Sequence, residues 1–269
     1  MLSLAGPIVA GALLANGRRA AAEPWPKRGL AANDGVPIWQ FGGRWADQAS
    51  GVNWQYNWDS TTDQKQDFAE YVPMLWGTQS FHTEHWAADA QRWIDAGGSG
   101  HLLAFNEPDR ADQAALDVAA AVRAWWQHME PFAGRARLGA PAVSAAGLDW
   151  LQAFLDQCGG CHVDFVPVHW YGGAAYEHEF ERFVDRVCEM SRGRKVWVTE
   201  FEGSGSAEEQ SQFIRKALPF LDNNDCVYRY SYFGTADNSK TLLDGGGPGL
   251  SGLGVQYTFS PFGNGDGPR

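Results

Sequence analysis

The chain has 269 residues and a formal net charge of −11, from 21 Lys and Arg against 32 Asp and Glu. No block of basic residues is present, so the composition argues against a nucleic-acid partner. The length suits one large domain, and no linker rich in Pro, Ser or Gly divides the chain.

The first residues differ in composition from the rest. Residues 2–15 are apolar and rich in Gly and Ala, and two arginines and the small residues 20–22 follow them. This pattern predicts a secretory signal peptide over residues 1–22, which leaves a catalytic domain over residues 23–269 and a secreted protein in the extracellular space or cell wall. The run is too short and too glycine-rich for a transmembrane helix, so we expect no membrane attachment after cleavage. An unstructured extension or a misplaced start codon is the alternative.

From residue 27 onward, short apolar runs alternate with amphipathic segments. Eight runs are typical of strands, namely residues 29–33, 51–58, 71–76, 102–105, 137–143, 163–170, 196–199 and 227–233. Most are followed by apolar residues at helical spacing, for example Trp86, Ala90, Trp93 and Ile94. Strands that alternate with helices form parallel sheets. Eight of them predict a single (β/α)₈ barrel, the TIM-barrel fold of the α/β class.

Four cysteines fit an exported protein with one or two disulfides. Cys158 and Cys161 have the spacing of a redox motif, but no thioredoxin-like pattern surrounds them, so a local structural disulfide is favoured. Cys188 and Cys226 would pair if a helix end and a strand end meet at the lower rim. Other pairings and a four-cysteine zinc site stay open as alternatives.

Two of the predicted strands end in a glutamate. Residues 102–105 stop at Asn106 and Glu107, and residues 196–199 lead into Glu200. In a barrel the fourth and seventh strands face each other across the rim that holds the active site. One strand-end glutamate is more often an ordinary rim residue, but two carboxyl groups about 5–5.5 Å apart are what a retaining glycosidase uses. We predict Glu107 as the proton donor, Glu200 as the nucleophile and Asn106 as the partner of the sugar 2-hydroxyl.

Other residues near the strand ends are candidates for substrate binding. Thirteen tryptophans exceed what a core of this size needs, and flat aromatic faces stack on pyranose rings. His169 is predicted to contact substrate or to hold Glu200 charged, and Glu202 is a competitor of Glu200 that we assign to a subsite. The remaining candidates are Trp54, Asn57, Trp76, Trp170, Tyr171 and Phe233, each of which is individually as consistent with core packing.

Six motifs occur together in one order: YNW at 56–58, VPMLW at 72–76, LLAFNEPD at 102–109, GAPAV at 139–143, DFVPVHWY at 164–171 and VWVTEF at 196–201. In this the chain resembles glycoside hydrolase family 128, the fungal and bacterial β-1,3-glucanases also described as Asl1-like glycosyl hydrolases. The resemblance implies a retaining barrel hydrolase whose acid and nucleophile match Glu107 and Glu200, and it implies a β-1,3-glucan substrate. Glu202 departs from the expected small or neutral residue, which leaves endo or exo action open.

The leading hypothesis is a secreted, monomeric endo-β-1,3-glucanase that hydrolyses β-1,3-glucan polysaccharide or oligosaccharides by double displacement, without metal or cofactor. The first alternative is a non-catalytic glucan-binding wall protein on the same barrel. The paired glutamates argue against it, because a binding module has no use for them. The second alternative is a barrel hydrolase that acts on another β-linked polymer, such as a mannan or a β-1,4-glucan.

Overall fold

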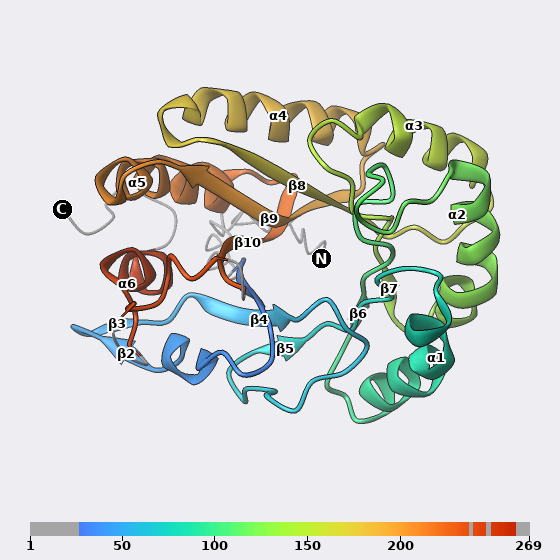
Figure 1. Ribbon diagram of the computed structural model, residues 1–269, viewed down its shortest axis with the longest axis horizontal. Coiled ribbons are helices and arrows are strands. Elements are labelled where there is room, and N and C mark those ends of the chain that lie inside the picture. Colours follow the sequence, from blue (N-terminus) through green and yellow to red (C-terminus); the bar gives the residue numbers. More distant parts are fainter. Residues whose placement is uncertain (1–26, 237–238, 246–248, 262–269) are drawn as a thin grey trace, which may run out of the picture.

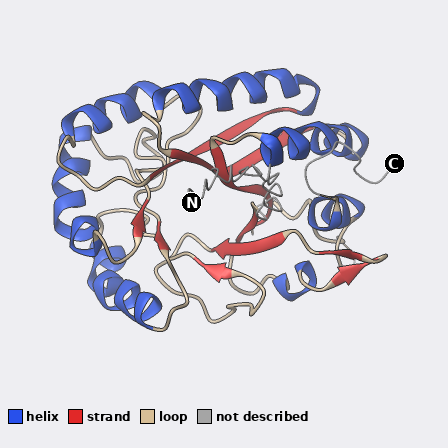
Figure 2. Ribbon diagram, turned by 180° about the vertical axis from the view of Figure 1, so that it is seen from behind, coloured by secondary structure: helices blue, strands red, loops and turns tan. Residues whose placement is uncertain are grey.

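A computed structural model describes residues 27–236, 239–245 and 249–261 of the chain. Figure 1 shows strands gathered at the centre and helices arranged around them, and Figure 2 shows the same arrangement from behind. The predicted signal peptide over residues 1–22 lies outside the described residues.

Six strands form one parallel sheet in the order β5-β4-β1-β10-β9-β8. Their bounds are β1 Arg28–Ala32, β4 Val52–Tyr56, β5 Glu70–Tyr71, β8 Phe165–Gly173, β9 Lys195–Ser204 and β10 Val227–Thr235. Two short strands, β6 His101–Leu102 and β7 Arg137–Leu138, pair in parallel with each other. These eight elements lie where the eight strands were predicted.

Single parallel bridges join the pair β6–β7 to both ends of the sheet. Met74, just after β5, bridges to Leu103, and Gly139 and Val143 bridge to Phe165 and Val168 of β8. The eight strands therefore follow one another in a ring, and the predicted α/β barrel is confirmed. Pro73 accounts for the short ladder of β5, because proline has no N–H to donate to a neighbouring strand.

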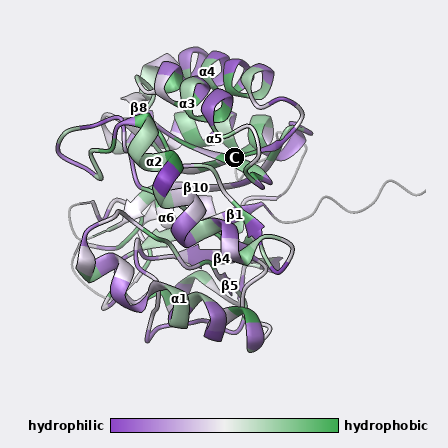
Figure 3. Ribbon diagram, turned by 90° about the vertical axis from the view of Figure 1, so that its right-hand side faces the viewer, coloured by the Kyte–Doolittle hydropathy of each residue, from purple (hydrophilic) through white to green (hydrophobic). Residues whose placement is uncertain are grey.

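Helices cover the outside of the ring. They are α1 Ser80–Asp95, α2 Val118–Ala124, α3 Leu148–Gln157, α4 Glu177–Met190, α5 Ala207–Asn223 and α6 Gly252–Phe259, with the π-helix η2 Trp125–Met129 and the 3₁₀ turns η1 Ile38–Phe41, η3 Glu130–Phe132 and η4 Ala174–Tyr176. Figure 3 shows hydrophilic and hydrophobic residues mixed along these helices, as expected when one face packs on the strands and the other faces water.

The first two strands depart from the βα pattern. After β1 come η1 and a small hairpin of β2 Arg44–Trp45 and β3 Gln48–Ala49. After β4 the chain runs as a loop over residues 57–69. Residues 59–67 read DSTTDQKQD and have no apolar stripe that could pack a helix against the barrel.

The core has two layers that alternate along the strands. Val196 and Val198 of β9 belong to the large outer cluster between strands and helices. Trp197 between them belongs to a smaller cluster inside the barrel, which also contains Trp54 and Tyr56 of β4. Because successive strand residues point to opposite faces, each inward side chain occupies a definite layer between the bottom and the top of the barrel.

A buried ion-pair network ties the bottom of the barrel together. Nη2 of Arg229 in β10 lies 2.5 Å from Oε2 of Glu70 in β5, and Nδ1 of His101 in β6 lies 2.8 Å from Oε1 of Glu70. The guanidinium also lies 4.7 Å from the ring centre of Trp197. Burial alone would raise the pKa of Glu70, but the hydrogen bond from His101 and the charge of Arg229 outweigh it and lower the pKa to about 2.

We expect Glu70→Gln to lower the free energy of unfolding at neutral pH by on the order of 3 kcal/mol, because a buried cation loses its partner. A carboxyl group with a lowered pKa contributes stability above its unfolded value near 4.5 and loses it as pH falls toward about 2. Denaturant unfolding from pH 7 to pH 2 should therefore show the gap between wild type and variant closing with acid. Exposed Glu189→Gln is the control, and a gap that is independent of pH would contradict this account.

The favoured local disulfide Cys158–Cys161 is confirmed, and the pair Cys188–Cys226, which the sequence left conditional, is present as well. The first closes the turn after α3, and the second links α4 to the start of β10.

Among the described residues, none of the helices has both the length and the apolar character that a membrane span requires.

Candidate active site

A cavity of about 550 Å³ opens where the carboxyl ends of the strands meet. This is the end of a parallel barrel at which active sites lie. The side chains that line the cavity are mostly aromatic, amide or charged: Asn33, Trp58, Trp76, Asn106, Glu107, Arg110, Gln113, Tyr171, Glu200, Phe233 and Ala236.

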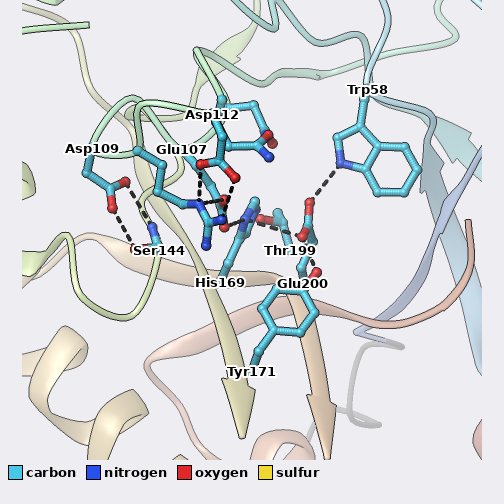
Figure 4. Close-up of polar contacts among 12 residues, drawn as sticks. Trp58, Glu107, Asp109, Asp112, Ser144, His169, Tyr171, Thr199 and Glu200 are labelled. Carbon is cyan, nitrogen blue, oxygen red and sulfur yellow. Dashed lines mark hydrogen bonds and ion pairs between the residues drawn. The ribbon is translucent and has the colours of Figure 1, made fainter. Parts of the chain in front are cut away.

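The structure brings the two predicted glutamates together in this cavity. One carboxylate oxygen of Glu107, one of Glu200 and a ring nitrogen of His169 lie within 4.8 Å of one another, and all three residues are buried. Nδ1 of His169 is 2.9 Å from Oε1 of Glu107 and 3.4 Å from Oε2 of Glu200. Figure 4 shows His169 between the two carboxyl groups.

The loop after β6 holds Glu107 in an unusual backbone conformation. Its φ is 40°, in the left-handed region that residues other than glycine rarely adopt. The backbone N–H of Glu107 donates to the carbonyl of Ala142 over 2.6 Å. The hydroxyl of Ser144 donates to Asp109 over 2.5 Å, so the loop after β7 fixes the loop that carries Glu107. Nε of Arg110 lies 3.2 Å from Oε2 of Glu107.

Glu200 of β9 accepts hydrogen bonds from three aromatic residues. The indole Nε1–H of Trp58 donates over 2.7 Å and the hydroxyl of Tyr56 over 3.2 Å, both to Oε1. The hydroxyl of Tyr171 donates to Oε2. Burial, and then the charge of Glu200, raises the pKa of Tyr171 and of Tyr56, so both hydroxyls keep the proton that they donate. Donors are thus directed at both oxygens of Glu200, and they fix the orientation of its carboxyl group.

His169 is the third buried titratable residue of the site and lies between the two carboxyl groups. Burial alone would lower the pKa of His169, but the charge of Glu200 and the hydrogen bond and charge of Glu107 outweigh it and raise the pKa. Nδ1 of His169 and Oε1 of Glu107 therefore share a buried hydrogen bond, and the raised pKa favours the ring as its donor. The set of two carboxylates and one imidazole could also ligate a metal ion. Here, however, the hydrogen bonds from Trp58, Tyr56 and Tyr171 already occupy both oxygens of Glu200.

Four predicted substrate-binding residues besides His169 lie at the cavity. Asn106 is buried next to Glu107; its Nδ2 donates to Oε1 of Gln113 over 3.1 Å, while its Oδ1 has no hydrogen-bond partner among the described residues. Tyr171 and Phe233 line one side, with their rings edge to face at 5.4 Å. Trp76 lines the wall after β5.

Two predicted substrate-binding tryptophans lie in the core, and this corrects the prediction. Trp54 is fully buried inside the barrel, where its Nε1–H donates to the carbonyl of Lys27. It shares a face of β4 with Tyr56, which lies one layer higher, and Trp58, which reaches the cavity, follows in the loop after β4. Trp170 follows inward-facing His169 and so points outward, where it packs on Phe180 at 5.1 Å.

Asn57 and Glu202 are also outside the cavity. The amide of Asn57 accepts from the hydroxyl of Tyr71 over 2.7 Å and donates to the carbonyl of Thr61, so it organises the loop after β4. Glu202 is half-buried two residues beyond Glu200, past the part of β9 that lines the cavity. Burial raises the pKa of Glu202.

Several residues of the site were not assigned a role there from the sequence, among them Tyr56, Trp58, Arg110 and Gln113. Tyr56 and Trp58 were visible as the end of an alternating aromatic series, but the turn that aims Trp58 at Glu200 was not. Trp58 adopts φ 61°, which ends the alternation. Arg110 and Gln113 lie in the loop after Glu107, where sequence gives no periodicity from which a side-chain direction could be read.

Comparison with known proteins places the chain among glycosidases. The model of the glycosyl hydrolase catalytic core family matches residues 29–257. "Alkali-sensitive linkage protein 1" of Schizosaccharomyces pombe is 31% identical over 226 residues. That alignment covers 77% of this chain but only 40% of the yeast protein, so the chain spans less than half of that relative.

Solved structures of similar enzymes cover nearly the whole barrel. A curdlan-specific exo-β-1,3-glucanase of family 128, subgroup III, from Blastomyces gilchristii has a TM-score of 0.78 and 42% identity, over 87% of this chain and 99% of that one. An endo-β-1,3-glucanase of subgroup I from Amycolatopsis mediterranei, solved with laminarihexaose, has a TM-score of 0.70 and 30% identity, over 86% of this chain and 98% of that one.

Proposed function

The chain is a glycoside hydrolase that belongs to family 128, and from this premise we propose that it is a secreted, retaining endo-β-1,3-glucanase. Glu107 is the general acid and base, and Glu200 is the nucleophile. Asn106, His169, Tyr171, Trp76 and Phe233 contact the substrate or orient the two glutamates. The substrate assignment is supported by the two similar enzymes of solved structure, from Blastomyces gilchristii and Amycolatopsis mediterranei, which are β-1,3-glucanases.

The observation that carries the proposal is the closeness of the two carboxylates. Their nearest oxygens lie within 4.8 Å. Retaining enzymes hold their carboxyl groups about 5–5.5 Å apart, whereas inverting enzymes hold them about 6.5–9.5 Å apart to admit a water molecule. The short spacing therefore supports direct attack by one carboxylate on the sugar.

In the first step, a carboxylate oxygen of Glu200 attacks the anomeric carbon and the glycosidic C–O bond breaks. Glu107 gives its proton to the leaving oxygen, and a glycosyl ester of Glu200 forms. The donors Trp58, Tyr56 and Tyr171 hold Glu200 in its orientation before the attack. The vacant Oδ1 of Asn106 is available to accept a hydrogen bond from the sugar 2-hydroxyl.

In the second step, Glu107 takes a proton from water, the water oxygen attacks the anomeric carbon, and the ester bond to Glu200 breaks. Glu200 returns as a carboxylate, and the product keeps the β configuration. Nδ1 of His169 lies 2.9 Å from Glu107 and 3.4 Å from Glu200, so the ring is placed to hydrogen-bond with either glutamate as the charge moves between them. The two disulfides fit an oxidising compartment and so support secretion.

A substrate panel tests the function. We expect release of reducing sugar from laminarin and curdlan, and none from carboxymethylcellulose or mannan. Endo action should give a mixture of oligosaccharides early in the reaction, and NMR of the fresh products should show the β anomer first. Hydrolysis of the β-1,4-linked polymers alone would contradict the substrate assignment. Glucose as the sole early product would contradict endo action, and an α anomer formed first would contradict retention.

A further inference from the structure

A run of three aromatic rings leads from the cavity wall to the outside of the protein. Trp76 lines the cavity. Its ring stacks on His82 with the ring centres 5.1 Å apart and the planes at 30°. The His82 ring in turn contacts Phe81, with centres 4.3 Å apart. We call these three residues the aromatic track.

The outer end of the aromatic track is open to solvent. Phe81 is 70% exposed, the largest exposure among the large hydrophobic side chains given for the described residues. Isolated exposed hydrophobic residues are common on protein surfaces and need no explanation. Phe81 is different, because contacting rings connect it to the wall of the cavity that holds Glu107 and Glu200.

The backbone holds the track in place. Phe81 and His82 lie in the first turn of α1, at the start of the helix that follows Trp76. The N–H groups of His82 and Thr83 both donate to the carbonyl of Gln79, so this turn is hydrogen-bonded. Burial lowers the pKa of His82, which favours the neutral form of the central ring. A neutral, apolar, flat surface suits an uncharged sugar better than a charged ligand.

The position of the track in the ring of strands matters for the path of a polysaccharide. Trp76 follows the third strand of the barrel, whereas Tyr171 and Phe233 lie at the sixth and eighth strands, on the other side of the cavity. Tyr171 is itself 45% exposed. Aromatic side chains therefore line the cavity on both sides of the catalytic pair, and on the side of the track they continue to the exposed ring of Phe81.

We propose that the aromatic track is a distal subsite, in which Phe81 stacks on a glucosyl unit of a β-1,3-glucan chain beyond the units held in the cavity. This inference rests on the proposed function and extends it. The chain then crosses the catalytic centre with sugar units on both sides, which is the binding mode of an endo-acting enzyme. Long glucan chains therefore bind more tightly because they contact Phe81, and chains too short to reach Phe81 do not.

The test compares chain lengths. In Phe81→Ala, the ratio of kcat/KM for laminarihexaose to kcat/KM for laminaritriose should fall about three- to tenfold, which corresponds to the loss of one aromatic stacking contact. Phe81→Trp, which keeps a flat ring, should restore the ratio. Trp126→Ala is the matched control, because Trp126 is also an exposed aromatic residue, at 49%, and does not line the cavity. Its ratio should equal that of the wild type.

Binding in an inactive background separates affinity from turnover. In Glu200→Gln, calorimetry should show laminarihexaose binding more tightly than laminaritriose, and adding Phe81→Ala should remove most of that difference. An unchanged length ratio in both assays, with wild-type enzyme active on laminarin, would overturn the distal subsite and leave the proposed function intact. A wild-type enzyme with no activity on any β-1,3-glucan would instead overturn the proposed function.

Discussion

Replacing Glu200 by glutamine is expected to reduce hydrolysis of laminarin by roughly 10³-fold or more, because the amide cannot form the glycosyl ester. The substitution keeps the shape of the side chain, and Trp58, Tyr56 and Tyr171 still surround it. The melting temperature should therefore stay close to that of the wild type. Initial rates of reducing-sugar release, measured with unfolding curves, check both expectations.

Glu202→Gln is the matched control for Glu200. It makes the same chemical change two residues further along β9, on a side chain that does not line the cavity. Its activity should stay within about threefold of wild type, as for most changes that touch no reacting group.

Glu200→Ala with added azide should give the α-glycosyl azide, because azide enters from the face that the nucleophile has left. Near-wild-type hydrolysis by Glu200→Gln would remove Glu200 from the mechanism.

Replacing Glu107 by alanine should lower kcat/KM on laminarin by about 10²- to 10⁴-fold, the usual contribution of a general acid. A dinitrophenyl glycoside of laminaribiose should behave differently, because its leaving group needs no proton. There kcat/KM should stay within about tenfold of wild type. Because the second step still lacks its base, the glycosyl ester should accumulate and produce a burst of dinitrophenol in stopped-flow traces.

Azide distinguishes the roles of the two glutamates. In Glu107→Ala, azide replaces water in the second step and should give the β-glycosyl azide, the opposite anomer to that expected for Glu200→Ala. Asp112→Asn is the control for lost negative charge, because exposed Asp112 also pairs with Arg110 but does not line the cavity. Equal losses on laminarin and on the dinitrophenyl glycoside in Glu107→Ala would argue against a role as proton donor.

The barrel was predictable because its signal is repeated. Each strand is a short apolar run, and most of these runs are followed by apolar residues at helical spacing. Few folds other than the (β/α)₈ barrel contain eight such units. The two loops after β1 and β4 broke the pattern, and sequence gave no reason to expect the hairpin β2–β3. Closure of the ring could not be derived from periodicity, because it depends on single bridges such as Met74–Leu103.

The catalytic pair was predictable because a parallel barrel gathers every strand end at one rim. That rule places Glu107 and Glu200 without any knowledge of side-chain conformation. The surrounding residues obey no such rule. Trp54 and Trp58 fit one alternating series in the sequence, yet Trp54 is fully buried in β4 and Trp58, in the loop after β4, contacts Glu200 at the top of the barrel. The prediction for Trp170 was wrong for a related reason: its side chain points outward from the barrel, whereas those of its neighbours His169 and Tyr171 point toward the site.

The left-handed backbone at Glu107 has a consequence for how this enzyme can change. A non-glycine residue in such a region costs on the order of 1–3 kcal/mol, which the bonds from Ala142 and Ser144 around the loop must offset. Glycine at that position would relax the loop and abolish the chemistry in one step. A substitution at this residue that raises thermal stability therefore removes catalytic activity. Laboratory evolution that selects only for stability would favour variants that are more stable but inactive.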